Sequence, residues 1–170
     1  TNMATESDPG SAKAQSIKRR QFIAGSGAAV LATSSALQAG ERAASKYRVA
    51  VIGHTGRGNY GHGLDRVWQE LPETQIVAVA DAEPKGLASA VTRLGDVKGF
   101  ADYRKMLVEI KPDLVAVAPR WLDQHCDMVL AAAEAGARGI YLEKPMCRNL
   151  EEADAMVAAC EKSGTKLTIA

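Results

Sequence analysis

The chain has 170 residues, of which 46% are hydrophobic and 24% are charged, so it is long enough for one compact domain and short for two. Its formal net charge is +1, and the surplus of +2 on residues 1–39 leaves −1 for the remainder. That surplus comes from four basic side chains against Glu6 and Asp8, namely Lys13, Lys18, Arg19 and Arg20. Such a balanced body argues against nucleic acid as a partner.

The three cysteines indicate neither a metal site nor a disulfide framework. Cys126, Cys147 and Cys160 lack the close CxxC spacing of a zinc site, and an odd number cannot pair completely. Cys126 and Cys160 fall on the apolar faces of predicted helices, which favours a structural role for both thiols. Cys147 lies closer to a charged strand end, and its role stays open.

Residues 1–45 have the layout of an export signal followed by a linker. A basic pair is followed by a weakly apolar run over residues 22–33, rich in Ala and Gly, and then by small residues. The run is too short and too rich in glycine to span a bilayer as a stable helix. We therefore exclude this segment from the predicted fold.

The basic pair, Arg19 and Arg20, resembles the twin-arginine consensus together with Lys18 and Phe22. Lys18 and Ile23 depart from that consensus, which has Ser or Thr and then Leu at these positions. We expect export to the periplasm, with the twin-arginine translocase as a partner during transport. The alternative is the basic tail of a cytoplasmic protein.

From residue 46 onward the pattern alternates between strands and helices. Continuous apolar runs predict strands covered on both faces at 47–53, 76–81, 97–100, 114–119, 139–143 and 166–170. Apolar residues at i, i+3, i+4 and i+7 predict one-sided helices over 64–71, 87–94 and 103–110, followed by helices at 122–135 and 149–164. For the last helix we expect Asn149 as the N-cap, with Glu152 reaching back to it. The alternation predicts an α/β fold for residues 46–170, a doubly wound parallel sheet of the Rossmann type.

A glycine-rich turn follows the first predicted strand and precedes the first predicted helix. A dinucleotide pyrophosphate needs backbone N–H groups at a helix N-terminus and no Cβ in the way. Gly53 would make the tight turn and Gly58 the close packing of the helix, with Thr55 where a second glycine is usual. Gly56, Gly58 and Gly61 also spell GxGxxG in a shifted register, so the register stays open.

An acidic residue, Asp81, closes the second predicted strand, where its carboxylate can accept hydrogen bonds from both adenosine ribose hydroxyls. It would repel a 2′-phosphate, which favours NAD over NADP as the cofactor. Arg57 and Lys85 leave NADP open, because either cation can neutralise a phosphate nearby. The alternative for Asp81 is a helix N-cap.

At the end of the fifth predicted strand stand Glu143, Lys144 and Pro145, which open into the crevice beyond the strand ends. The chain resembles the family of glucose-fructose oxidoreductase, inositol dehydrogenase and rhizopine-catabolism proteins (Gfo/Idh/MocA). The resemblance rests on this strand end together with the glycine loop, the stretch VAVAD, Pro119 with His125 downstream, and AGARGIYLEKPM. The resemblance covers about residues 46–170 and includes the hallmark Glu-Lys-Pro.

The resemblance implies an NAD(P)-dependent oxidoreductase that transfers hydride to or from a sugar or polyol, as a homo-oligomer when full length. Lys144 would lie beside the nicotinamide and the substrate hydroxyl as the catalytic amine. Pro119 and His125 would flank the cofactor, although His125 alone is also typical of a helix residue with a structural partner. Family members carry a second α+β domain that is absent here, so we expect this chain to be a fragment, inactive by itself.

Two other functions stay open. Some relatives are NAD-dependent glycosidases, which oxidise a sugar, eliminate the aglycone and reduce again with the same bound cofactor. A non-catalytic nucleotide or sugar sensor on the same fold is the third hypothesis, since a fold does not dictate activity.

Overall fold

The computed structural model describes residues 46–170, and the predicted export signal lies outside them. The strands are β1 (Tyr47–Ile52), β2 (Thr74–Ala80), β3 (Lys98–Phe100), β4 (Leu114–Val117), β5 (Gly139–Leu142) and β6 (Lys166–Ile169). The α-helices are α1 (Pro84–Arg93), α2 (Tyr103–Ile110), α3 (His125–Glu134) and α4 (Leu150–Ser163). Two short 3₁₀ helices, η1 (Val67–Glu70) and η2 (Leu122–Gln124), complete the described part.

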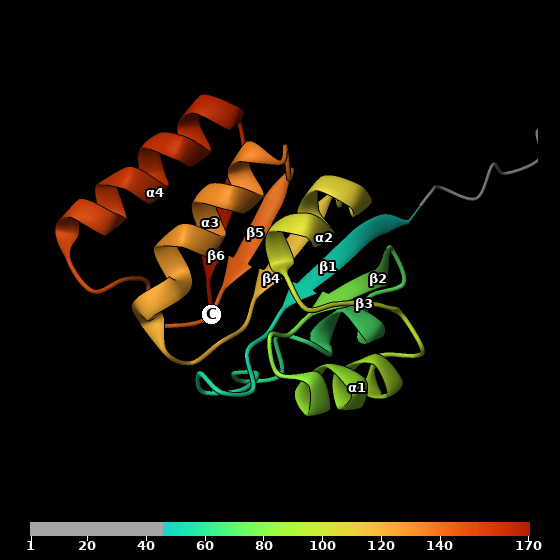
Figure 1. Cartoon of the computed structure of the whole chain (residues 1–170). Coiled ribbons are helices and arrows are strands. Elements are labelled where there is room, and N and C mark those ends of the chain that lie inside the picture. Colours follow the sequence, from blue (N-terminus) through green and yellow to red (C-terminus); the bar gives the residue numbers. More distant parts are fainter. Residues whose placement is uncertain (1–45) are drawn as a thin grey trace, which may run out of the picture. The chain divides into compact units, whose positions relative to one another are not determined.

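The strands form one parallel sheet in the order β3-β2-β1-β4-β5-β6 (Figure 1). The order reverses between β1 and β4, because the chain adds strands on one side of β1 and then on the other. All carboxyl ends therefore lie along one edge, with a crevice at the reversal point. This arrangement confirms the predicted doubly wound α/β fold.

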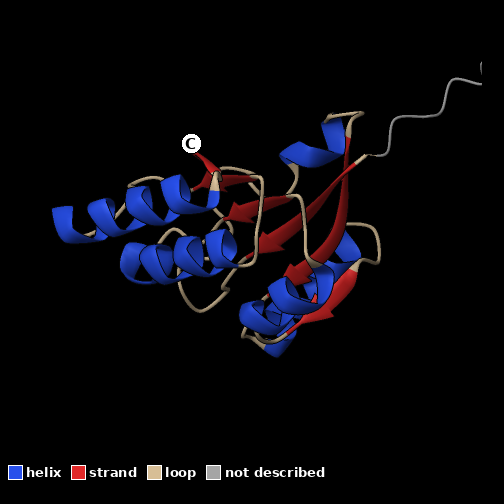
Figure 2. Ribbon diagram, turned by 90° about the horizontal axis from the view of Figure 1, so that it is seen from above, coloured by secondary structure: helices blue, strands red, loops and turns tan. Residues whose placement is uncertain are grey.

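The two faces of the sheet carry separate apolar layers. Ala50 and Ile52 of β1 point to the face covered by α2, α3 and α4, whereas Val49 and Val51 point to the face that packs against α1. Helices α3 and α4 lie beside each other on the first face (Figure 2). Burial on both faces explains why the strands read as continuous apolar runs instead of alternating ones.

The helix predicted over residues 64–71 is wrong. The segment forms successive turns and then η1, and its apolar residues are only partly used: Leu64 is buried, but Val67 and Leu71 are about two-fifths exposed. The backbone just before it lies in the left-handed region at His62 (φ 42°) and Gly63 (φ 76°), so no helical turn leads into Leu64. The indole of Trp68 donates to the Leu64 carbonyl and closes the segment on itself.

The last helix begins as predicted at its N-cap but differs in one contact. The Asn149 side chain accepts from the Glu152 N–H at 2.9 Å, and the helix ends at Gly164 in the left-handed conformation. The Glu152 carboxylate reaches one residue farther back than predicted, to the N–H and guanidinium of Arg148. These hydrogen bonds from Arg148 lower the pKa of Glu152.

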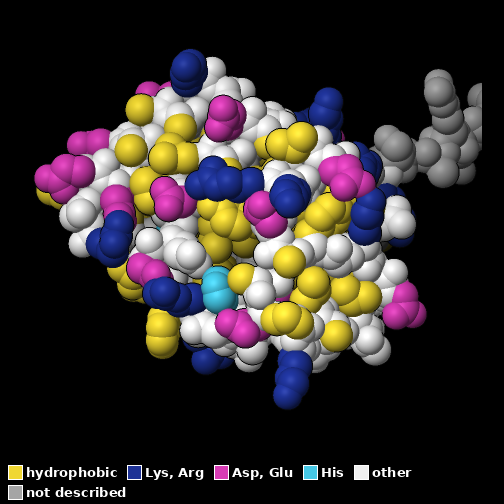
Figure 3. Space-filling model, viewed as in Figure 1, with side chains coloured by type: hydrophobic (Ala, Val, Ile, Leu, Met, Phe, Trp, Pro, Cys, Tyr) yellow, Lys and Arg dark blue, Asp and Glu magenta, His cyan; other side chains and the backbone are white. Residues whose placement is uncertain are grey.

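The surface of the described part mixes charges of both signs. On the face seen in Figure 3, Lys and Arg side chains alternate with Asp and Glu around small apolar areas. None of the helices within residues 46–170 has the length and apolar character needed to cross a membrane.

Candidate functional site

The carboxyl ends of four strands meet at one edge of the sheet, and main-chain hydrogen bonds extend one residue beyond each strand. Gly53 donates to the Ala80 carbonyl at 2.9 Å, and Ala118 donates to the Ile52 carbonyl at 2.9 Å. Glu143 continues the ladder by donating to Val117 at 2.8 Å. The residues at these tips are therefore held as firmly as the strands themselves, which is the requirement for a preorganised site.

The glycine loop, which we define as residues 53–63, crosses this edge as a series of tight turns. The His54 carbonyl accepts the N–H groups of Arg57 and Asn59 at 2.9 and 3.0 Å. Gly58 adopts a left-handed conformation with φ of 83°. Within residues 46–170, the N–H groups of Gly56 and Gly58 donate to no protein acceptor. Free main-chain amides in a turn of this kind can form an anion-binding nest.

The glycines are required because other side chains approach them closely, but their neighbours differ from those that the sequence indicated. A Cβ on Gly58 would lie 2.8 Å from the Arg120 Cβ, and one on Gly56 would lie 2.9 Å from the Glu83 carboxylate. Gly58 therefore packs against the segment after β4 and not against a helix. A Cβ on Gly53 would lie 2.0 Å from the Tyr60 ring, so this residue makes room for an aromatic side chain.

Asp81 lies at the end of β2 with only 1% of its surface exposed. Its carboxylate accepts the Thr55 N–H and hydroxyl, the latter at 2.6 Å, the Tyr60 hydroxyl at 3.0 Å and the Glu83 N–H at 3.0 Å. Burial and then the charge of Asp81 raise the pKa of Tyr60, which keeps this phenol protonated as a donor. In this structure Asp81 thus binds the glycine loop, and it also lines the cavity at the tip of β2, where the ribose contact expected from the sequence stays a prediction. Glu83, two residues later, is exposed beside Gly56.

Arg57 fastens the loop to the segment after β4. Its guanidinium pairs with Asp123 at 2.7 Å and lies 5.8 Å above the Trp121 ring. In this structure Arg57 is therefore engaged with Asp123 and Trp121. Arg120 is exposed against Gly58 and joins none of the ion pairs found in residues 46–170. No sequence motif points to Arg120, because only tertiary packing brings it to the loop.

Glu143 at the tip of β5 is completely buried. One of its oxygens lies 2.7 Å from Nδ1 of His62, and the other, Oε2, has no hydrogen-bond partner. The glycine loop presses on this carboxylate, since a Cβ on Gly61 would lie 2.2 Å from Oε2. Lys144 and Pro145, which follow, are exposed at the same edge, and the peptide bond between them is cis.

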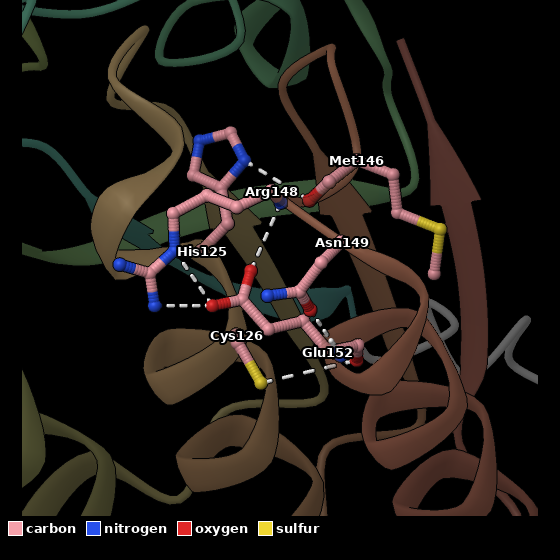
Figure 4. A network of polar contacts seen from close by, with 6 residues as sticks. All are labelled: His125, Cys126, Met146, Arg148, Asn149 and Glu152. Atoms are coloured by element: carbon pink, nitrogen blue, oxygen red, sulfur yellow. Dashed lines mark hydrogen bonds and ion pairs between the residues drawn. The ribbon is translucent and has the colours of Figure 1, made fainter.

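His125, at the start of α3, is also completely buried. Its Nε2 lies 2.7 Å from the carbonyl of buried Pro119, and its Nδ1 lies 3.0 Å from the Pro145 carbonyl and 3.3 Å from that of Met146. The ring therefore joins the segment after β4 to the turn after β5 and has no face left for a cofactor. Figure 4 shows the same turn held again by Arg148 and Glu152 at the start of α4.

A cavity of about 180 Å³ opens between the tips of β1 and β2 and the first turns of α2 and α3. Its lining includes His54, Ala82, Tyr103, Gln124 and Met128, a mixture of apolar and polar side chains. Two buried polar atoms of these residues, Nδ1 of His54 and Oε1 of Gln124, have no partner within the protein. Within residues 46–170, no group of three His, Cys, Asp or Glu side chains is arranged to hold a metal ion.

Comparison with known proteins identifies an NAD-binding domain. Residues 47–170 match the family described as an oxidoreductase family with an NAD-binding Rossmann fold (Gfo/Idh/MocA). A D-apiose dehydrogenase of Paraburkholderia graminis is 32% identical over 124 residues, which are 73% of this chain and 32% of that protein. A glycosyl hydrolase family 109 protein of Bacteroides fragilis is 32% identical over 127 residues, 69% of this chain and 27% of that protein.

Among solved structures, the fold is similar to that of an oxidoreductase from Agrobacterium radiobacter in complex with NAD⁺, L-tartaric acid and magnesium. The TM-score is 0.65 at 24% sequence identity, and the match covers 74% of this chain and 35% of that one. At this identity the likeness shows the fold. The chain spans about a third of the length of the curated relatives it matches. With the family model covering all of the described fold, the chain belongs to the Gfo/Idh/MocA oxidoreductase family and comprises its NAD-binding Rossmann domain.

Proposed function

We propose that this chain is the NAD-binding part of an exported oxidoreductase that transfers hydride to or from a sugar or polyol. The observation that carries this proposal is the placement of free glycine-loop amides at the same sheet edge as Lys144. The loop contacts Glu143 through Gly61 and His62, so the anion-binding nest and the amine lie on directly connected segments. The D-apiose dehydrogenase relative supports a carbohydrate as the substrate.

The residues present fit a dinucleotide. The free N–H groups of Gly56 and Gly58 would hold the diphosphate, with the exposed guanidinium of Arg120 as the neighbouring cation. The cavity lined by His54 and Gln124 suits a planar base, because it combines apolar walls with unpaired polar atoms. When bound, the nicotinamide supplies the hydride acceptor or donor.

Lys144 would hold the reacting oxygen of the substrate. Its side chain is exposed at the crevice, whereas the residues on both sides are fixed by His62 and His125. An ammonium in such a place stabilises a developing alkoxide and exchanges the proton of the hydroxyl. The further substrate contacts belong to the part of the protein beyond the matched domain.

NAD is favoured over NADP by the carboxylates at the tip of β2. Asp81 is buried there and Glu83 is exposed beside Gly56, so a 2′-phosphate would meet two negative charges. Arg57 is paired with Asp123 and does not offset them. We expect NADH to bind at least tenfold more tightly than NADPH, which competitive titration would measure.

The binding step is tested by titrating the purified protein with NADH and by measuring thermal stabilisation with NAD⁺. Gly58→Ala should weaken NADH binding at least tenfold, because the Cβ enters the space beside Arg120. Gly95→Ala is the matched control, since its φ of 96° imposes the same backbone cost with nothing within 4 Å of the Cβ. A wild-type protein that neither binds NADH nor gains stability from NAD⁺ would refute the proposal.

The export proposal rests on the basic pair and the apolar run that follows it, which lie outside the described residues. Twin-arginine export carries folded proteins, so a cofactor loaded in the cytoplasm would be retained and recycled outside, where free dinucleotide is scarce. Arg19→Lys combined with Arg20→Lys should retain the precursor in the cytoplasm. Unchanged periplasmic delivery would contradict this part of the proposal. A homo-oligomer of the full-length protein remains part of the proposal, to be measured by light scattering.

An NAD-dependent glycosidase is the second candidate, favoured by the similarity to the glycosyl hydrolase family 109 protein. The full-length protein distinguishes the two activities. Release of the aglycone from a nitrophenyl glycoside, without net formation of NADH, would favour the glycosidase. A sensor would be favoured if the full-length protein binds dinucleotide and Lys144→Ala changes no measurable property.

A further inference from the structure

Glu143 is the least satisfied buried charge at the site. Its side chain is fully enclosed, and within residues 46–170 its carboxylate has one polar partner, His62 Nδ1 at 2.7 Å. Its second oxygen has neither solvent nor a donor. Removing the partner of a buried charge is far more disruptive than removing a surface pair. The backbone at the tip of β5 is held by the sheet, but the Glu143 carboxylate depends for its polar contact on a single imidazole from another segment.

His62 is fixed on the loop side of this contact by backbone geometry. It has a φ of 42°, and the preceding Gly61 donates its N–H to the Ala118 carbonyl at 2.7 Å. Nδ1 of His62 and Oε1 of Glu143 share one hydrogen in this contact. Just over half of the His62 side chain is exposed, and the interaction is thus open to solvent on the side of the loop.

Lys144 lies between two anchored positions. Glu143 before it is held by His62, and the Pro145 carbonyl after it lies 3.0 Å from Nδ1 of His125. The two histidines differ in origin, because His125 belongs to α3 and His62 to the glycine loop. The first anchor belongs to the glycine loop itself, whereas the second reaches the loop only through the segment after β4.

We propose that His62 is a positioning residue that couples the glycine loop, through Glu143, to the placement of Lys144. This inference rests on the proposed function, because the coupling matters when the loop holds a diphosphate. A ligand that orders the loop then also orders the turn that carries the amine. The hydrogen bond between His62 and Glu143 is the physical link between cofactor binding and the reacting end of the site.

Hydrogen exchange of the purified protein, followed by mass spectrometry on peptides 54–63 and 142–149, tests the coupling. His62→Ala should accelerate exchange of peptide 142–149 about tenfold or more, because a charge-assisted hydrogen bond is lost. His62→Asn should restore slow exchange, since its amide nitrogen replaces the Nδ1 donor. Peptide 103–110 in α2 is the internal control and should be unchanged, which separates a local effect from global destabilisation.

The nucleotide arm of the experiment uses NAD⁺ as the probe. In the wild type, NAD⁺ should slow exchange in both peptides, whereas in His62→Ala it should slow only peptide 54–63. Equal protection of peptide 142–149 in both proteins, or equal exchange without nucleotide, would overturn the coupling. If NAD⁺ protects neither peptide in the wild type, the proposed function fails, and the comparison without nucleotide still decides the role of His62.

Discussion

Two buried carboxylates, Asp81 and Glu143, meet the glycine loop at opposite ends of the crevice, and they are satisfied very differently. Asp81 accepts hydrogen bonds from the Thr55 N–H and hydroxyl, the Tyr60 hydroxyl and the Glu83 N–H. Glu143 has one partner, His62, and one oxygen with none. Both side chains are almost or fully inaccessible to solvent.

The difference indicates separate tasks for the two contacts. A buried carboxylate with all of its hydrogen bonds made rigidifies the segments that it joins. A carboxylate with one partner and one unpaired oxygen costs free energy and is sensitive to the position of that partner. Asp81 therefore fixes the fold of the loop, whereas Glu143 transmits the position of the loop to Lys144.

The largest expected effect follows replacement of the well-satisfied acid. Asp81→Asn presents an amide nitrogen to donors at Thr55, Tyr60 and Glu83, so at least one of them loses its acceptor. We expect the free energy of unfolding to fall by about 3 kcal/mol. Urea unfolding followed by circular dichroism would measure this, and a loss below about 1 kcal/mol would show that Asp81 does not organise the loop.

Gly61→Ala tests the contact at the other end of the loop. The new Cβ would lie 2.2 Å from Oε2 of the enclosed Glu143 carboxylate, so this side chain would have to shift. Overpacking of this kind should lower the free energy of unfolding by about 2 kcal/mol. Gly61 does not have a positive φ, so this loss reports the contact and not a left-handed backbone. A loss below about 0.5 kcal/mol would contradict close packing of the loop on Glu143.

The Tyr60 hydroxyl makes the Asp81 end sensitive to alkaline pH. Burial and Asp81 raise the pKa of Tyr60 in the folded state, so its contribution is fully present below the unfolded pKa of about 10 and is lost as pH rises above it. Between pH 9 and 11 the wild type should lose about 1 kcal/mol more stability than Tyr60→Phe. The pKa of Tyr103 is also raised by burial, but this residue is common to both proteins and cancels in the comparison. Parallel pH profiles would exclude the Tyr60 contact.

The smallest expected change in stability is that of Glu143→Gln. The substitution removes a buried charge, which stabilises the fold, and it weakens the hydrogen bond with His62, which destabilises it. The amide keeps an acceptor for His62, so the two effects oppose each other. We expect the free energy of unfolding to change by less than about 1 kcal/mol in either direction. Chemical denaturation of this variant beside Asp81→Asn gives the sharpest contrast, because losses of similar size would remove the distinction between the two acids.

Much of the fold was predictable because the sheet is buried on both faces. Each strand reads as a continuous apolar run, and helix α2 begins and ends where the spacing of Tyr103, Met106, Leu107 and Ile110 indicated. The helix predicted after the glycine loop was wrong although its apolar spacing fits a helix, since residues 64–66 form turns and Val67–Glu70 a short 3₁₀ helix. Periodicity describes which side chains face inward, but it does not ensure that the backbone between them is helical.

The site was predicted in part. The glycine loop, the acid after β2 and the Glu-Lys-Pro sequence were visible because each follows a strand end, and parallel strands bring such ends together. A structural role was one of the alternatives for His125 and is confirmed, but its partners and those of Asp81 were not visible, since they are distant in the chain. His62 and Arg120 had no sequence signal at all, because a lone histidine or arginine is common on any surface.

The sequence by itself determined the order of strands and helices, the edge of the sheet that carries the site, and the amine and carboxylates available there. The elements follow from hydrophobic patterns that extend over a few residues. The edge that carries the site follows from the parallel direction of the strands, which brings their carboxyl ends together. Only the tertiary structure decided that Asp81 faces the loop and that Glu143 depends on His62. Those contacts join residues 26 and 81 positions apart in the chain, and their geometry is set by packing over the whole domain.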